Sequence, residues 1–109
     1  MKQDLYAEYF YGKKVTVMGL GLLGRGVGDT MFLAENNAEL IVTDMKEQTA
    51  LEESVKALAS YPGIIYHLGA HVSADFEKRD FILKAAGVPL DSSYIAHAKS
   101  LEVPVYMSA

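Results

Sequence analysis

The sequence contains no cysteine, no long apolar run and no excess of basic residues. Without cysteine, the chain has neither a disulfide framework nor a thiolate metal site. The formal net charge of −4 does not favour broad nucleic-acid binding. No apolar run approaches the roughly 18 residues that span a bilayer, and residues 1–14 lack the continuous apolar region of a signal peptide. We therefore expect a cytoplasmic protein that binds neither membrane nor nucleic acid.

The composition that is present suits one soluble globular domain. The chain has 109 residues, of which 50% are hydrophobic and 22% are charged. A chain of this length can bury one core, but it rarely forms a complete two-substrate enzyme with a cleft between domains. No linker or internal repeat divides it, so residues 1–109 are expected to form a single domain.

Apolar strands alternate with helical segments along the chain. Strands are expected at residues 13–19, 39–44, 64–69, 80–87 and 103–107. Helices are expected at residues 4–10, 22–36, 49–61 and 92–101. Because the strands are apolar throughout, the sheet should be covered on both faces. The pattern predicts an α/β fold, Rossmann-like and doubly wound, whose five parallel strands lie in the order 3-2-1-4-5.

Side chains are expected to cap two of these helices. Thr49 and Glu52 have the spacing of a capping box, and Ser92 and Ser93 follow Asp91 at the start of the last helix. The last helix should turn three side chains inward, namely Ile95, Ala98 and Leu101.

A glycine-rich loop follows the first strand. Gly19, Gly21 and Gly24 form the pattern G-x-G-x-x-G between a strand and a helix. In that context Gly19 permits the tight turn, Gly21 lets a phosphate approach the backbone, and Gly24 lets the helix pack closely. The helix N-terminus favours an anion, and Asp44 ends the second strand at the distance typical of a ribose-binding carboxylate. The motif predicts a site for a phosphate and a ribose.

Two further features belong to this predicted site. Arg25 lies in the first turn of the helix, where it can reach a phosphate or pair with Asp29 at i+4. After the fourth strand comes a second backbone loop, a Gly-Val-Pro-Leu-Asp turn at residues 87–91, at the same edge of the sheet. Two such loops facing each other across the switch point of the sheet suit a pyrophosphate held from both sides.

These segments together resemble the N-terminal domain of the Mur ligases, the ATP-dependent amide ligases of peptidoglycan synthesis. The resemblance rests on "KVTVMGLGLLGRG", "ELIVTD", "YHLGAH" and "DFILKAAGVPLDSSYIAHAKSLEVPVY", and it extends from about Lys13 to the end. It is strongest to the branch that joins D-glutamate to UDP-N-acetylmuramoyl-L-alanine. In that family this domain holds the uridine diphosphate of the substrate and no cofactor of its own.

The resemblance implies roles for individual residues. Carried over position by position, they are Leu22, Leu23 and Gly24 with their backbone N–H groups on the diphosphate, Asp44, Met45 and Lys46 on the uridine, and Ala85, Ala86 and Gly87 closing over the diphosphate. Two departures bear on these contacts. The family commonly has Ser-Pro-Gly at residues 85–87, so a hydroxyl contact is lost, and it often has a hydroxyl residue or arginine at the position of Met45.

The family's ATP site does not occur in this sequence. No G-T-x-G-K-[ST] run is present, and the D-glutamate-binding C-terminal domain is missing too. The resemblance therefore implies a piece of a longer ligase whose other domains supply the ATP and magnesium sites, and which is inactive alone. Two other functions use the same residues: the NAD-binding domain of a dehydrogenase, and a regulatory nucleotide-sensing domain.

The remaining polar residues have ordinary explanations. His67 and His71 are four residues apart, but the third strand ends between them, so we expect strand-end residues and no metal site. His97 should be a surface or boundary residue. Residues 75–80 should form a solvated turn, in which Arg79 pairs with a neighbouring acid for little gain. No nucleophile with an adjacent base is evident.

Overall fold

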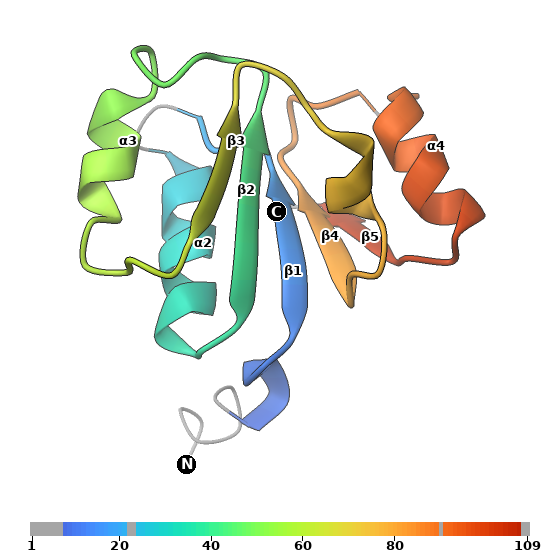
Figure 1. The fold of residues 1–109 in the computed structure, drawn as a ribbon, viewed down its shortest axis with the longest axis horizontal. Coiled ribbons are helices and arrows are strands. Elements are labelled where there is room, and N and C mark those ends of the chain that lie inside the picture. The colour runs from blue at the N-terminus through green and yellow to red at the C-terminus, as the bar shows by residue number, and fades with distance from the viewer. Residues whose placement is uncertain (1–7, 22–23, 90, 108–109) are drawn as a thin grey trace.

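The computed structural model describes residues 8–21, 24–89 and 91–107 (Figure 1). The strands are β1 (Lys14–Met18), β2 (Glu39–Asp44), β3 (Ile65–Leu68), β4 (Phe81–Lys84) and β5 (Val105–Met107). The helices are α2 (Arg25–Glu35), α3 (Glu52–Ala57), α4 (Ser93–Ser100) and the 3₁₀ helix η1 (Ser73–Phe76). Each expected strand is confirmed: β2 has the expected bounds, and the other four strands are shorter than expected.

The five strands form one parallel sheet in the order β3-β2-β1-β4-β5, as predicted. Val15 of β1 lies opposite Leu40 of β2 on one side and Phe81 of β4 on the other. The chain therefore adds β2 and β3 on one side of β1, and then returns to add β4 and β5 on the other side of the sheet. This reversal leaves a switch point at the carboxyl ends of β1 and β4, where ligands bind in such sheets.

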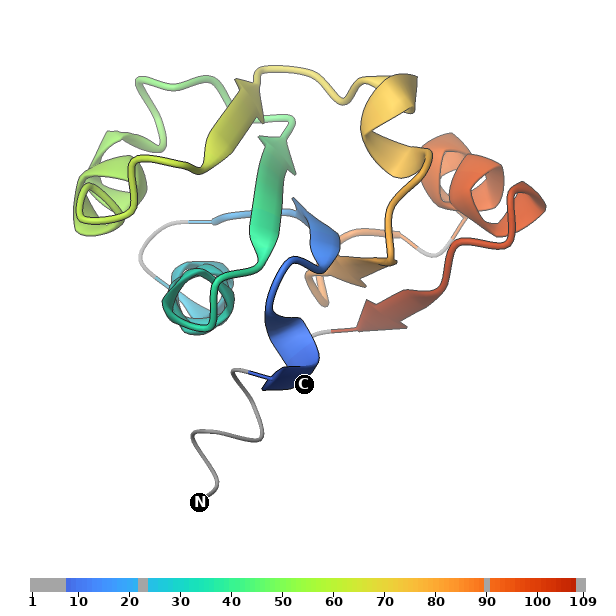
Figure 2. The same cartoon turned by 60° about the horizontal axis from the view of Figure 1, so that its bottom comes forward.

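Helices cover both faces of the sheet, as Figure 2 shows from a second direction. Successive residues of a strand point to opposite faces, and β1 uses this alternation to join two cores. The core beneath α2 and α3 includes Val15, Val17, Val27, Leu33, Val42 and Leu58. The core beneath η1 and α4 includes Met18, Phe76, Ile82, Ile95 and Ala98. The doubly wound architecture is therefore confirmed.

The start of α3 differs from the prediction. The predicted capping box is absent, because Leu51 occupies the N-cap position and no side chain caps the helix. The N–H of Leu51 donates instead to the carbonyls of Glu47 and Gln48, at 3.3 and 3.0 Å. This backbone turn contains Thr49 and delays the helix, so Glu52 is its first residue and cannot fold back as the partner in a capping box.

The last helix follows the prediction at its start and departs from it at its end. The Oγ of Ser92 accepts a hydrogen bond from the N–H of Tyr94 at 3.3 Å, so Ser92 is the N-cap. Ile95 and Ala98 are fully buried, but Leu101 is 49% exposed. Leu101 is the C-cap residue, beyond the last helical turn, so helical periodicity no longer sets its direction.

No helix in the described ranges is long and apolar enough to cross a membrane.

Candidate functional site

A cavity of about 750 Å³ opens at the carboxyl edge of the sheet, at the switch point. The glycine loop after β1 forms one wall, and the loop after β4 forms the opposite wall. Residues that follow β2 and β3 and residues at the start of α4 complete its lining. The cavity therefore lies where the sequence predicted a ligand.

The glycine loop needs glycine for two different reasons. Gly19 has φ +99°, and a Cβ there would lie 2.8 Å from the Cβ of Ala85 in the facing loop. Gly21 has φ +72°, but an added Cβ would meet nothing within 4 Å. Both φ values belong to the left-handed region that disfavours other residues. Gly19 thus lets the two loops touch, and Gly21 leaves its backbone open toward the cavity.

A glycine that the motif does not include brings α2 close to this loop. A Cβ at Gly26 would lie 2.1 Å from the carbonyl oxygen of Leu20 and 2.8 Å from that of Gly19. Gly24, to which the motif gave the close helix packing, is the N-cap of α2 and lines the cavity. The helix begins at Arg25, later than predicted, which brings Gly26 onto the loop backbone.

Asp44 is buried, with 7% exposure, and its carboxylate binds backbone N–H groups of two loops. Its Oδ2 accepts from the N–H of Leu20 at 2.9 Å and of Gly21 at 3.2 Å, while Oδ1 accepts from the N–H of Lys46 at 2.8 Å. The sequence predicted the position of this acid at the cavity, but not that it fixes the shape of the glycine loop. These N–H groups are consequently not available to a phosphate.

Ser54 holds the same loop from α3. Its side chain is fully buried, and its Oγ donates to the carbonyl oxygen of Gly21 at 2.6 Å. The peptide groups on both sides of Gly21 are therefore held, one by Asp44 and the other by Ser54. The sequence signal for this contact is a serine on the apolar side of an amphipathic helix.

The facing loop is a tight turn built on β4. The N–H of Ala85 donates to the carbonyl of Met18 at 2.9 Å, and the N–H of Val88 closes the turn onto the carbonyl of Ala85 at 3.1 Å. Ala86 and Gly87 are its central residues and are exposed. Ala85 and Gly87 line the large cavity, whereas Ala86 lines a smaller hollow of about 160 Å³ beside it.

Three of the other predicted site residues also reach the cavity. Arg25, Met45 and Lys46 are exposed and line it, so cationic groups stand at two places on its rim. Leu22 and Leu23 lie outside the described residues, and their predicted N–H contacts remain a prediction. The structure thus brings together at this cavity every described residue of the predicted site except Ala86.

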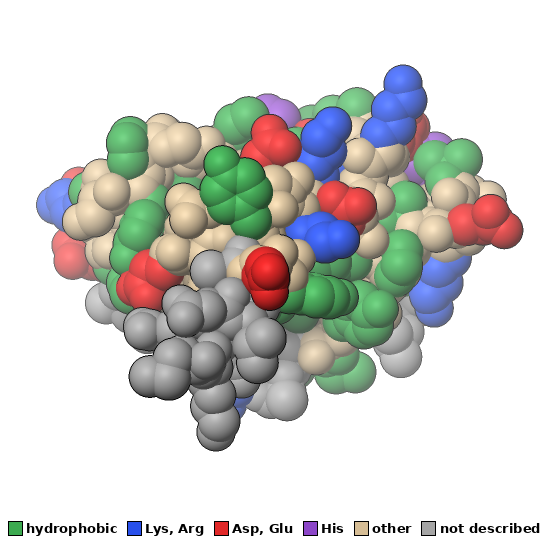
Figure 3. Space-filling view, turned by 90° about the horizontal axis from the view of Figure 1, so that it is seen from below, with side chains coloured by type: hydrophobic (Ala, Val, Ile, Leu, Met, Phe, Trp, Pro, Cys, Tyr) green, Lys and Arg blue, Asp and Glu red, His purple; other side chains and the backbone are tan. Residues whose placement is uncertain are grey.

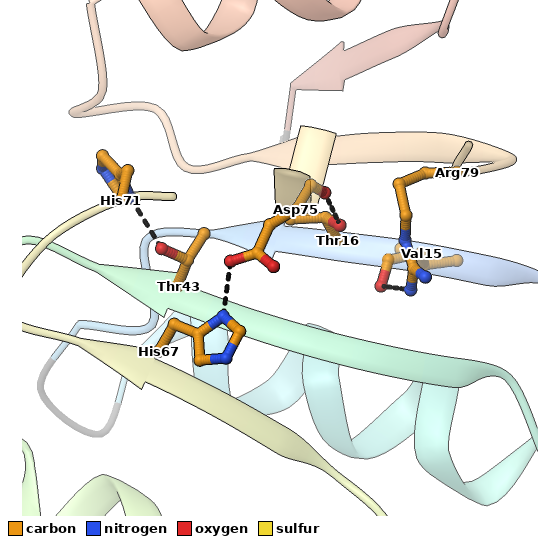
Figure 4. Close-up of polar contacts among 7 residues, drawn as sticks. All are labelled: Val15, Thr16, Thr43, His67, His71, Asp75 and Arg79. Carbon is orange, nitrogen blue, oxygen red and sulfur yellow. Dashed lines mark hydrogen bonds and ion pairs between the residues drawn. The ribbon is translucent and has the colours of Figure 1, made fainter. Parts of the chain in front are cut away.

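His71 lines the same cavity and was not predicted to belong to the site. Figure 4 shows its ring above the end of β2, where Nδ1 lies 2.7 Å from Oγ1 of Thr43. The rings of Phe76 and Tyr94 meet it edge-on, with centroids 6.1 and 5.2 Å away. Burial lowers the pKa of His71 from its usual 6.5, against the opposing effect of Asp44 and Asp75.

The two histidines of "HLGAH" have different hydrogen-bond partners. His67 Nδ1 lies 2.6 Å from Oδ2 of the buried Asp75, as Figure 4 also shows. Within the described ranges, no group of three or more histidine, aspartate or glutamate side chains could hold a metal ion. His97 lies at the surface, 2.6 Å from the carboxylate of Glu77, as a boundary residue.

Residues 75–80 are not the solvated turn that was predicted. Asp75 is buried as the third residue of η1, and its carbonyl accepts from Oγ1 of Thr16 at 2.5 Å. Arg79 donates to the carbonyls of Val15 and Glu39, at 3.0 and 3.1 Å, and Figure 4 shows the bond to Val15. None of the ion pairs among the described residues includes Arg79. Burial lowers the pKa of Arg79 below its usual value. The segment therefore links η1 and the residues before β4 to β1 and β2 through hydrogen bonds.

A second large cavity, of about 690 Å³, lies at the opposite edge, where the strands begin. Tyr11, Asn37, Glu39, Tyr61 and Arg79 are among its lining residues. Figure 3 views this side, where acidic, basic and hydrophobic side chains are intermixed. Parallel α/β sheets bind ligands at the carboxyl edge, and the open glycine backbone and exposed cations lie there too. We therefore take the cavity between the two loops as the candidate functional site.

Comparison with known proteins gives one consistent family. Residues 13–107 match the family described as "Mur ligase MurD-like, N-terminal domain". The UDP-N-acetylmuramoylalanine–D-glutamate ligase of Borreliella burgdorferi (strain ZS7) is 39% identical over 90 residues, which cover 82% of this chain and 20% of the relative. The ligase of the same name from Treponema pallidum (strain Nichols) is 45% identical over 73 residues, covering 67% and 14%. The chain spans about a fifth of the length of such relatives or less.

Solved structures that resemble the chain agree on the fold alone. An aspartate transcarbamoylase from Trypanosoma cruzi superposes with a TM-score of 0.52 at 17% identity, covering 97% of this chain and 41% of the transcarbamoylase.

The family match extends over most of the chain, and it includes both loops of the cavity and the strands that position them. The chain therefore belongs to the MurD-like N-terminal domain family of the Mur ligases.

Proposed function

We propose that this domain binds the uridine diphosphate part of UDP-N-acetylmuramoyl-L-alanine for a ligase that attaches D-glutamate to it. The observation that supports this most is the cavity between the glycine loop and the 85–88 turn, in a chain whose relatives are named for that reaction. Gly21 and Gly87 both leave open space beside their backbones, so a diphosphate can approach from either wall.

The charges of the cavity are suited to such a ligand. The N-terminus of α2 faces the cavity at Gly24 and favours an anion. Arg25 and Lys46 provide exposed cations at the rim. The bound diphosphate would therefore meet a helix terminus on one side and cations at the rim, with the uridine directed toward Met45 and His71.

In this proposal Asp44 has only part of its hydrogen-bond acceptor capacity left for the ligand. A carboxylate has about four acceptor positions, and three backbone N–H groups use three of them. One position is left for a hydroxyl or N–H group of the uridine. An NAD-binding domain would use the same acid for the ribose of its cofactor, so Asp44 by itself does not separate the two functions.

The chemistry of the whole enzyme would depend on other domains. The family resemblance assigns ATP and magnesium to the central domain and D-glutamate to the C-terminal domain, so this domain would position the nucleotide end of the substrate. In keeping with that role, we expect the protein in the cytoplasm and the rest of the ligase chain as its partner.

A calorimetric titration tests the proposal on the 109-residue chain. Because one side of the bound ligand stays exposed to water, we expect UDP-N-acetylmuramoyl-L-alanine to bind with a Kd near the millimolar range, or about 4 kcal/mol. NADH contains the same pyrophosphate, but its nicotinamide half would need a second mononucleotide unit to lie against. Tighter binding of NADH than of the uridine compound would overturn the proposal in favour of the dehydrogenase alternative.

A further inference from the structure

Lys84 is a buried cation that the proposed function does not yet use. It ends β4, and only 2% of it is exposed. Its Nζ donates to the carbonyl oxygen of Val88 at 2.6 Å and to that of Ala85 at 3.0 Å. Among the described residues no carboxylate lies within 4.0 Å of this Nζ, since none of the ion pairs there includes Lys84.

A buried lysine without a carboxylate partner needs an explanation. Moving a charge out of water is costly unless an opposite charge and hydrogen bonds compensate it. Two carbonyl dipoles supply hydrogen bonds, but they supply no counter-charge. A methionine or leucine would fill the same volume without that cost, so the ammonium group is expected to serve a purpose beyond packing.

The position of Lys84 links it to the cavity. Both carbonyls that it binds belong to residues that line the cavity, Ala85 and Val88. The Nζ therefore lies directly behind the wall formed by the 85–88 turn. The two bonds also orient the turn: because a trans peptide directs its N–H opposite to its C=O, the bond to the carbonyl of Ala85 turns the N–H of Ala86 away from Lys84.

We propose that Lys84 is a positioning residue for the anionic part of the ligand, which holds the 85–88 turn in place and supplies a counter-charge to the phosphates from behind it. This inference rests on the proposed function, since it needs a phosphate-bearing ligand in the cavity. The charge of Arg25 and Lys46 at the rim is exposed and screened by water. The charge of Lys84 is shielded from solvent and has a fixed position, so it discriminates better between charged and neutral ligands.

Binding of UDP and of uridine to the 109-residue chain tests this proposal. We expect Lys84→Met to weaken UDP by roughly tenfold, the effect of one partly screened charge, and uridine by less than twofold. Lys84→Gln keeps side-chain donors without the charge and should show the same selective loss of UDP. Lys99→Met removes an exposed charge from α4 outside the cavity and should change neither affinity. A purely structural lysine would weaken UDP and uridine equally.

A measurement on the unmodified chain covers the case in which the variants do not fold. The ¹⁵Nζ resonance of Lys84 should move when UDP is added and stay in place when uridine is added at the same occupancy. An unmoved resonance with bound UDP, or a UDP-to-uridine affinity ratio unchanged in Lys84→Gln, would overturn the inference. Failure of UDP to bind the unmodified chain at all would instead overturn the proposed function.

Discussion

At the scale of single residues, Asp44 connects the stability of the domain to the shape of its site. Its three hydrogen bonds hold Leu20, Gly21 and Lys46 around one carboxylate. Sequence reasoning placed this acid at the ligand edge as a ribose-binding carboxylate. It did not predict that the glycine loop is built on this carboxylate. A residue of this kind influences binding and folding together.

Replacing Asp44 should therefore destabilise the domain as well as weaken ligand binding. In Asp44→Ala three backbone N–H groups lose a charged acceptor, and we expect the free energy of unfolding to fall by about 2–4 kcal/mol. Asp44→Asn keeps the shape and part of the acceptor capacity, so its loss should be smaller. Urea unfolding of the two variants measures the difference. If Asp44→Ala unfolds at the same urea concentration as the unmodified chain, the hydrogen bonds described for Asp44 do not stabilise the loop.

His71 should make stability depend on pH. Because burial lowers its pKa in the folded state below 6.5, the unfolded chain takes up a proton first as the pH falls. The contribution of His71 is complete above pH about 6.5 and is lost as the pH falls from there through the lowered pKa. In His71→Gln the decline of stability between pH 7.5 and 5 should be less steep. An NMR titration of the His71 ring that gives a pKa above 6.5 would contradict this prediction.

At the scale of elements, the start of α2 sets the width of the site. Gly26 brings the first turn of the helix against the carbonyls of Gly19 and Leu20. Gly28 lies two residues further along the helix and has open space beside it. The two glycines lie in the same helix and differ only in what surrounds them. They offer a matched pair for testing the close contact between α2 and the glycine loop.

Alanine at these two positions should have opposite effects. Gly26→Ala places a Cβ into the backbone of the loop, and overpacking of this kind costs about 1–3 kcal/mol. Gly28→Ala meets no atom within 4 Å and should stabilise the chain by about 0.4–1 kcal/mol, because it restricts the unfolded state. Thermal unfolding of both variants provides the comparison. Equal stability of Gly26→Ala and Gly28→Ala would show that the helix is not held as close to the loop as the structure indicates.

Most of the elements could be predicted from the sequence, because their apolar patterns reflect burial in a sheet covered on both faces. The strand order followed from the alternation of strands and helices. What could not be predicted depends on contacts distant in sequence. The bond from Ser54 to Gly21 spans 33 residues, and the bond from Arg79 to Val15 spans 64. Local patterns were also insufficient at helix ends, where the turn around Thr49 replaced a capping box and Leu101 lay beyond the last turn.

At the scale of the whole molecule, we propose that this domain binds the nucleotide part of the substrate and that other domains carry out the reaction. The proposed ligase joins a carboxylate to an amine, and the groups that the family resemblance assigns to ATP and magnesium are not in this sequence. We expect the 109-residue chain to release no phosphate above background when given ATP, magnesium, D-glutamate and UDP-N-acetylmuramoyl-L-alanine. Phosphate release that requires all four components would contradict the assignment of catalysis to other domains.

The central claim is that the nucleotide binds between the glycine loop and the 85–88 turn. Amide chemical shifts recorded during a titration with UDP-N-acetylmuramoyl-L-alanine test it most directly. We predict that the amides of Gly21, Gly24 and Gly87 move together along one binding curve, while those of Gly12 and Gly63 at the opposite edge do not. Movement of Gly12 and Gly63 with the loop amides unchanged would place the ligand in the other cavity and contradict the account.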